Sequence, residues 1–127
     1  GPLAFEQGSA AGLPFEEAVL DVVVSSLAFH HLNPSVKRMA LSESYRVLRP
    51  GGRLWIADFG PPRTRIGMVA TLPIRMLDGN TTSDNFLGRM PALIEGAGFS
   101  HVVEVERFYT IFGPVCFYAA NKKGDQL

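Results

Sequence analysis

Two apolar, β-branched runs separated by a helical stretch constrain the fold of this chain more than any other feature. Residues 19–24 and 54–59 are almost entirely apolar, a pattern typical of strands buried on both faces, as in a parallel sheet. Between them, Asn33 and Pro34 provide an N-cap and a first-turn proline, and the Pro-Gly-Gly at 50–52 provides a helix stop. This order predicts a right-handed β-α-β unit whose two strands lie parallel.

The C-terminal part of the chain predicts an antiparallel element instead. Residues 84–97 have helical periodicity, with Pro91 opening or kinking the helix and Gly98 ending it. Residues 102–110 and 115–120 flank a Phe-Gly-Pro turn. We expect these two runs to pair as an antiparallel hairpin.

Two segments are less regular. Residues 3–7 are expected to form a short strand, and the small residues at 8–12 a loop. Residues 61–82 combine prolines, three arginines and a loose set of apolar side chains, which favours a broken helical excursion over a strand.

Composition narrows the class of protein. A chain of 127 residues with 46% hydrophobic and 19% charged residues suits one globular domain. Its 12 basic and 12 acidic side chains cancel, which gives no electrostatic case for nucleic acid or for an anionic membrane as partner. The single cysteine, Cys116, cannot form an internal disulfide and fits a reducing, cytoplasmic setting. No run approaches the roughly 20 apolar residues of a membrane span.

Three motifs that follow one another in order carry a family resemblance. They are "GSAAGLPFEEAVLDVVVSSLAFHHL", "ALSESYRVLRPGGRLWIADFG" and "LIEGAGF". Together they resemble the class I S-adenosylmethionine-dependent methyltransferases, and among these the ubiquinone/menaquinone-biosynthesis type (methyltransferase type 11 group). The resemblance runs over almost the whole chain. It implies S-adenosylmethionine as cofactor and a small molecule as methyl acceptor.

The same resemblance implies the arrangement of the sheet. The family's strand order is 3-2-1-4-5-7-6, with the last strand antiparallel. Residues 3–7 resemble its third strand, 19–26 its fourth, 53–59 its fifth, and the hairpin its sixth and seventh. We therefore expect a single α/β domain over residues 1–127. It would have a partial Rossmann-like fold, with a mostly parallel sheet that the C-terminal antiparallel hairpin closes.

The sequence departs from the family pattern in its cofactor motif. No G-x-G-x-G occurs in the chain, and the family's first two strands have no counterpart before residue 3. The expectation is a chain truncated in its cofactor half, which binds S-adenosylmethionine poorly and is inactive alone. Two explanations stay open. The sequence is a piece of a longer enzyme, or the gene itself is shortened and its product is a remnant or is completed by a partner.

The resemblance assigns cofactor contacts to two places. Ser9 and Ala10 match the family's position after the third strand, where an acidic residue is common, and a plain loop is an equal alternative. Ser25, Ser26 and Leu27 follow the fourth strand at its carboxyl end, the edge where ligands bind in such sheets. Hydroxyl capping of the strand end is the alternative for the two serines.

We expect the methyl acceptor to bind near the histidines that follow residues 19–26 and near the end of the strand at 53–59. His31 is the candidate catalytic base, with a structural histidine as the alternative. His30 and Asp58 are candidate substrate contacts, and for Asp58 a cap of the following turn is the alternative. Residues 61–82 resemble the family's variable substrate lid, from which Arg63 and Arg75 are expected to meet substrate. Solvated arginines are the alternative. A metal site is not expected, because the adjacent histidines have no third ligand nearby in the sequence.

Two functions from different classes stay open. The first is methyl transfer to a small molecule in the full-length enzyme. The second is a non-catalytic remnant or oligomerising module with a methyltransferase fold. A homo-oligomer is expected in either case, because residues 19–24 would form an apolar sheet edge with one charge and no proline or lysine.

Overall fold

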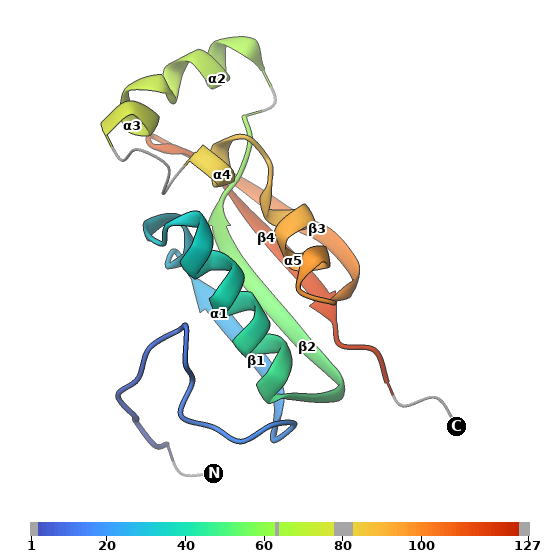
Figure 1. The fold of residues 1–127 in the computed structure, drawn as a ribbon. Coiled ribbons are helices and arrows are strands. Elements are labelled where there is room, and N and C mark those ends of the chain that lie inside the picture. The colour runs from blue at the N-terminus through green and yellow to red at the C-terminus, as the bar shows by residue number, and fades with distance from the viewer. Residues whose placement is uncertain (1–2, 63, 78–82, 125–127) are drawn as a thin grey trace.

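The described residues of the computed structural model, 3–62, 64–77 and 83–124, form a four-stranded mixed sheet with the strand order β1-β2-β4-β3 (Figure 1). Strands β1 and β2 pair in parallel, whereas β4 pairs antiparallel with both β2 and β3. The elements in chain order are β1 (Leu20–Ser26), η1 (Phe29–His31), α1 (Pro34–Val47), β2 (Leu48–Phe59), α2 (Arg65–Ala70), α3 (Leu72–Leu77), α4 (Ser83–Phe86), α5 (Met90–Gly96), β3 (Ser100–Thr110) and β4 (Gly113–Asn121).

The β-α-β unit predicted from the sequence is present as β1, α1 and β2. The Asn33 side chain caps α1 as expected, since its Oδ1 accepts the Val36 N–H at 2.9 Å. The predicted helix stop was wrong, because α1 ends at Val47 and residues 50–52 lie inside β2. The pairing with β1 jumps from Leu48 to Arg53, so these residues bulge out of the ladder, where Pro50 has no sheet hydrogen bond to disrupt.

Helices cover one face of the sheet. Figure 1 shows α1 and α5 on the same side, and the buried core between helices and sheet includes Leu41, Leu54, Ile56 and Ile94. The opposite face is open among the described residues, and Val24 there is 70% exposed. The prediction that residues 19–24 are buried on both faces was therefore wrong, because the described helices pack on only one face.

The predicted strand at residues 3–7 was also wrong. These residues are coil, and Leu3 and Phe5 are exposed. A short strand is stable only when its main chain pairs with a neighbour, and no strand of the described chain lies beside this segment. The only pairing nearby is an isolated bridge between Ser9 and Gly12.

The second half of the chain follows the sequence pattern more closely. The antiparallel hairpin of β3 and β4 is confirmed. The single helix expected over 84–97 is divided into α4 and α5 by Gly88, whose φ of +73° is left-handed and disfavours any other residue. Proline opens α5, as one of the two sequence alternatives stated.

The broken helical excursion expected at 61–82 appears as α2 and α3, with residues 63 and 78–82 outside the described chain. Figure 1 shows these two helices at one end of the molecule, beyond the carboxyl end of β2.

Among the described residues, no helix has the length and apolar character needed to cross a membrane.

Candidate functional site

The carboxyl ends of β1 and β2 lie side by side because the two strands are parallel, and they bring most of the predicted residues to one edge. Ser25 points to the helix-covered face and is half-buried, whereas Ser26 is exposed. Leu27 extends the pairing, since its N–H donates to the Ala57 carbonyl at 2.7 Å. Its φ of +53° turns the chain away from the sheet, and its side chain is largely exposed.

Asp58 is a buried acceptor that organises the turn after β1. Its Oδ2 accepts the N–H groups of Phe29 at 2.8 Å and His30 at 3.3 Å. Its Oδ1 accepts the Phe59 N–H at 2.9 Å and lies 2.8 Å from His30 Nδ1. With its side chain fully buried and both oxygens occupied, the Asp58 carboxylate fixes η1 against the end of β2.

The two histidines of η1 have different surroundings. His30 is buried, and its ring packs edge-on against Phe59 with 4.8 Å between centroids. Because Asp58 accepts at Nδ1, the neutral ring of His30 carries its proton there and leaves Nε2 as an acceptor. His31 is exposed, and its ring centroid lies 3.8 Å from that of His30. An exposed imidazole thus stacks on a buried one that a carboxylate orients.

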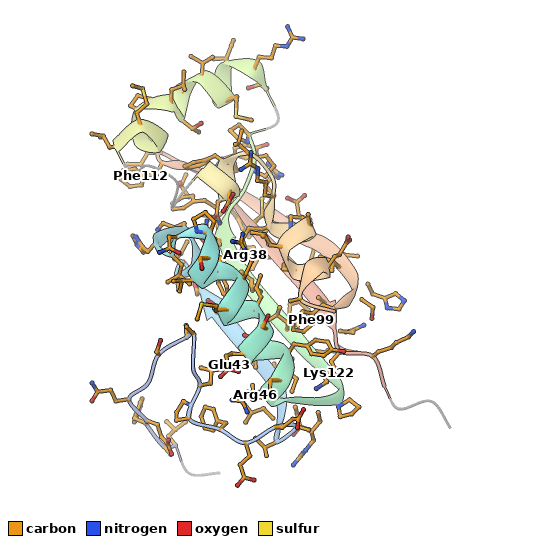
Figure 2. The ribbon with its side chains drawn as sticks, viewed as in Figure 1. Arg38, Glu43, Arg46, Phe99, Phe112 and Lys122 are labelled. Carbon is orange, nitrogen blue, oxygen red and sulfur yellow. The ribbon has the colours of Figure 1, made fainter. Side chains whose placement is uncertain are left out.

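Ser9 and Ala10 lie in the loop that precedes β1. Ser9 closes a tight turn, in which its Oγ accepts the Ala11 N–H and its carbonyl accepts the Gly12 N–H. The following Leu13 is held by Glu43 and Arg46, on the C-terminal half of α1 (Figure 2). The same half of α1 anchors the start of β1, so the chain that follows this loop is attached near the amino end of the strand.

The predicted substrate arginines fall outside the described side chains. Arg63 lies outside the described residues, and Arg75 belongs to α3 but its side chain is outside them too. The neighbouring Arg65 begins α2 and is exposed.

A buried polar cluster beside Asp58 was missed at the sequence level. The Lys37 ammonium donates to Asn85 Oδ1 at 2.9 Å and lies 3.6 Å from Asp84 Oδ2. The Asn85 amide donates in turn to the Phe59 carbonyl at 2.9 Å. Burial lowers the pKa of Lys37, and the charges of Asp84 and Asp58 limit the fall.

A sequence signal for this cluster exists. Lys37 occupies the same helical face as the buried Ala40, Leu41 and Ser44, at spacings of three, four and seven residues. A lysine inside such an apolar stripe indicates a buried amine that needs acidic or carbonyl partners.

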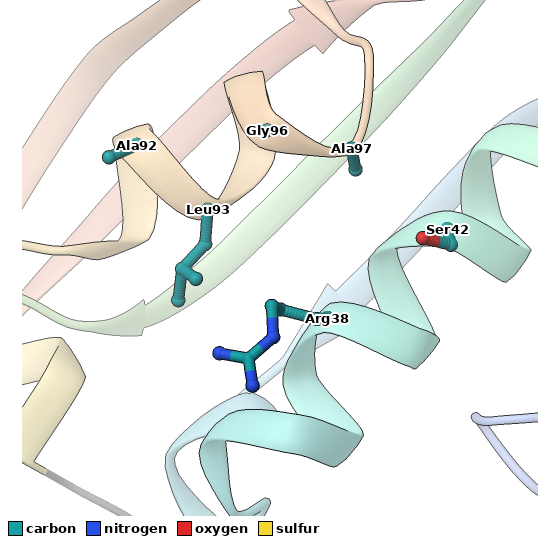
Figure 3. A pocket seen from close by; sticks show the side chains of 6 residues that line it. All are labelled: Arg38, Ser42, Ala92, Leu93, Gly96 and Ala97. Atoms are coloured by element: carbon teal, nitrogen blue, oxygen red, sulfur yellow. The ribbon is translucent and has the colours of Figure 1, made fainter.

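Two of the grooves outside this edge lie against helices. One, of about 190 Å³, runs between α1 and α5, where Arg38 and Ser42 face the small residues of α5 (Figure 3). The other, of about 220 Å³, lies between α2 and the β3–β4 turn, and is lined by Pro62, Gly67, Ala70, Thr71, Tyr109, Thr110, Ile111, Phe112, Gly113 and Pro114. No charged side chain of the described residues lines this second groove, so it suits an apolar group. Among the described residues, no three His, Cys, Asp or Glu side chains come together as a metal site.

In comparisons with known proteins, the sequence similarity falls mainly on the β-α-β unit. Residues 1–56 match the family described as Methyltransferase domain, which spans β1, α1 and most of β2. A demethylmenaquinone methyltransferase of Beutenbergia cavernae is 45% identical over 60 residues, which are 47% of this chain and 24% of that protein. The matched stretch is thus about a quarter of the curated relative's length.

Solved structures extend the likeness to nearly the whole chain. A SAM-dependent methyltransferase of Methanosarcina mazei superposes with a TM-score of 0.75 at 17% identity, covering 98% of this chain and 69% of the other. The [4+2]-cyclase SpnF has a TM-score of 0.67 at 15% identity, covering 95% and 56%. At this identity the superpositions show the fold, which hosts more than one chemistry. The chain is therefore related to the methyltransferase domain family through residues 1–56, and its described residues have the mixed α/β fold of S-adenosylmethionine-dependent methyltransferases.

Proposed function

We propose that this protein takes part in S-adenosylmethionine-dependent methyl transfer to a small molecule. The observation that carries the proposal is that the family match falls on β1, α1 and most of β2, and so includes Ser25 to Leu27 and ends two residues before Asp58. Ligands of open α/β sheets bind at the carboxyl ends of the strands, which is the edge where Ser25 to Leu27 lie. The acceptor class to test first is a quinol-type ring, because the curated relative is named for a demethylated menaquinone.

The groups at the strand end fit one side of a cofactor site. Ser25 and Ser26 offer hydroxyls that can donate and accept, and the exposed Leu27 side chain offers apolar contact to an adenosyl group. When bound, S-adenosylmethionine supplies an activated methyl group. Ser9 and Ala10 stay candidate contacts for the adenine.

The acceptor side of the site would be formed by η1 and the segment 61–82. Asp58 holds His30, and the exposed His31 is the group that can take a proton from an acceptor hydroxyl. His30 and Asp58 then act mainly by positioning, since both are buried. Residues 61–82, with Arg63 and Arg75, are proposed to close over the acceptor and exclude water.

We expect the chain by itself to bind S-adenosylmethionine weakly and to be inactive alone, because its sequence contains no G-x-G-x-G loop. Isothermal titration measures this. A micromolar dissociation constant for S-adenosylmethionine would overturn the expectation of a weak site.

In a full-length enzyme that contains this chain, His31→Ala should lower methyl transfer more than it lowers cofactor binding, because the ring is exposed at the acceptor side of the edge. The readouts are transfer of labelled methyl groups to a quinol at saturating S-adenosylmethionine, and cofactor binding by titration. The matched control is His101→Ala, an exposed histidine on β3. Equal effects of the two substitutions on methyl transfer would indicate that His31 has only a structural role.

The second candidate function is an oligomerising module of methyltransferase fold, catalytic or not. It is favoured by β1, which is the outer strand of the described sheet and carries exposed Val22 and Val24. We expect a homo-oligomer through pairing of this edge with a second copy. Sedimentation should show a dimer that Val24→Lys converts to monomer. A clean 13.8 kDa species for the unaltered chain would contradict it.

A cytoplasmic setting is also proposed. Cys116 is a free, buried thiol and the only cysteine of the chain, which suits a reducing compartment. Fluorescence microscopy of a tagged copy tests it.

A further inference from the structure

The outward face of α2 and α3 is apolar, the reverse of an ordinary surface helix. Ile66 is 85% exposed, Met76 79% and Leu77 86%, and Val69 and Leu72 between them are exposed as well. Steps of three and four residues from 66 through 69, 72 and 76 continue one stripe along both helices. Surface helices normally turn such a stripe toward the core. A contiguous apolar surface of this kind marks a site of interaction.

The other side of α2 faces the β3–β4 turn, although no residue of α2 itself is buried. Thr71 is buried, and a Cβ on Gly67 would lie 2.8 Å from the ring of Pro62. Gly67 and Thr71 also line the groove against the β3–β4 turn. The outward stripe therefore lies on a different side of α2 from Gly67 and from the groove.

The turn between β3 and β4 adds aromatic surface at the same end of the molecule. Tyr109 and Phe112 are exposed, and Ile111 between them is 93% exposed. Phe112 lines the same groove as Gly67 and Ala70 of α2, and residues 108–115 contain no charged side chain. Aliphatic and aromatic side chains gathered in this way are typical of elements that lie in the interfacial layer of a bilayer.

Arg65 is the one charged residue among the described side chains of α2, α3 and the β3–β4 turn. Residues 61–77 contain three arginines and no aspartate or glutamate, and Arg65 is exposed at the start of α2. The net charge of the whole chain is zero and therefore does not reveal this local excess of positive charge. Arginines beside an apolar stripe complement the negative surface potential of anionic lipids.

We propose that the end of the molecule formed by α2, α3 and the β3–β4 turn docks on an anionic lipid surface. Ile66, Val69, Met76, Leu77 and Phe112 would enter the headgroup boundary, and Arg65 would lie among the phosphates. This mode rests on the surface without spanning the bilayer. It does not depend on methyl transfer, so it can hold or fail separately from the proposed function.

The test is co-sedimentation of the 127-residue chain with vesicles of phosphatidylcholine alone, or of phosphatidylcholine mixed with phosphatidylglycerol. We expect binding to the mixed vesicles that weakens with added salt, and weaker binding to the neutral ones. The double substitution Ile66→Ser, Met76→Ser should reduce the partition coefficient roughly tenfold or more. The control Leu3→Ser, Phe5→Ser removes two equally exposed apolar side chains from the coil and should bind as the unaltered chain does.

A second measurement needs no substitution. Amide exchange in the presence of mixed vesicles should slow in residues 65–77 and 108–113, and not along the outer edge of β1. Failure to bind either vesicle would overturn the proposal, as would equal losses in the two double variants. It would also fail if the stripe proved to join two copies, so that the unaltered chain self-associates without lipid and Ile66→Ser, Met76→Ser makes it monomeric.

Discussion

Asp58 accepts four hydrogen bonds although its side chain is shielded from solvent. Three of the donors are main-chain N–H groups, two of them in η1. A carboxylate in such a position satisfies N–H groups that would otherwise be buried without partners. The geometry of η1, and with it the exposure of His31, therefore depends on one side chain of β2.

Asp58→Asn should destabilise the fold by about 2 to 4 kcal/mol, because one acceptor oxygen becomes an NH₂ group that faces N–H donors. Urea unfolding measures the change. The control Asp21→Asn alters an exposed carboxylate paired with Arg49 on the surface, and its effect should be small. Similar losses in the two variants would show that Asp58 does not organise η1.

The buried thiol of Cys116 should make the free energy of unfolding depend on pH in the alkaline range. Burial raises the pKa of its thiol from 9.0 to about 11. The folded state therefore keeps the proton while the unfolded chain begins to lose it near pH 9, so stability falls between about pH 9 and 11 by about 2 to 3 kcal/mol. Chemical unfolding at a series of pH values should show this fall in the unaltered chain relative to Cys116→Ala. Parallel curves for the two proteins would contradict it.

At the scale of elements, α4 is held by polar contacts in place of a long apolar face. It has only four residues, and Asn85 ties it to the end of β2 through the Phe59 carbonyl and to α1 through Lys37. These contacts fix the point where the chain returns from the segment 61–82. The base of that segment is thus anchored on the same strand end that carries Asp58.

Asn85→Ala should release α4 and cost about 1 to 3 kcal/mol, since the Lys37 ammonium loses a buried acceptor. Amide exchange should rise in residues 84–88 more than elsewhere. Asn33→Ala, the matched control, removes the cap of α1 at about 1 kcal/mol and should speed exchange at the start of that helix only. Unchanged exchange at α4 in Asn85→Ala would show that apolar packing alone holds it.

Elements with strong periodicity could be predicted from the sequence, and the contacts between them could not. The β1 run, the Asn33 cap and the hairpin follow from local patterns that need no knowledge of neighbours. The strand expected at 3–7 failed because pairing requires a partner strand. The helix break at Gly88 was hidden because one glycine is compatible with a continuous helical pattern.

In the candidate site, too, some features could be predicted from the sequence and others could not. Placing Ser25, Ser26 and His31 at a strand end required only strand boundaries and the rule for parallel sheets. The role of Asp58 could not be read, because its partners are mostly main-chain groups. Lys37 was overlooked because its acceptors, on α4, lie nearly 50 residues away in the sequence.

At the scale of the whole molecule, three surfaces have different characters. One sheet face is covered by α1 and α5, the other is open, and the end formed by α2, α3 and the β3–β4 turn is apolar with exposed arginine. The edge with Ser25, His31 and Asp58 lies between the sheet and this apolar end. An acceptor that partitions into lipid would meet the candidate site from that side.

The most direct test of the cofactor edge is a nuclear magnetic resonance titration of the labelled chain with millimolar S-adenosylhomocysteine. The account predicts amide shifts centred on Ser25, Ser26 and Leu27, with smaller shifts in η1, and saturation only at high ligand concentration. Shifts confined to the groove of Arg38 and Ser42 between α1 and α5, or none at all, would contradict a cofactor site at the carboxyl ends of β1 and β2.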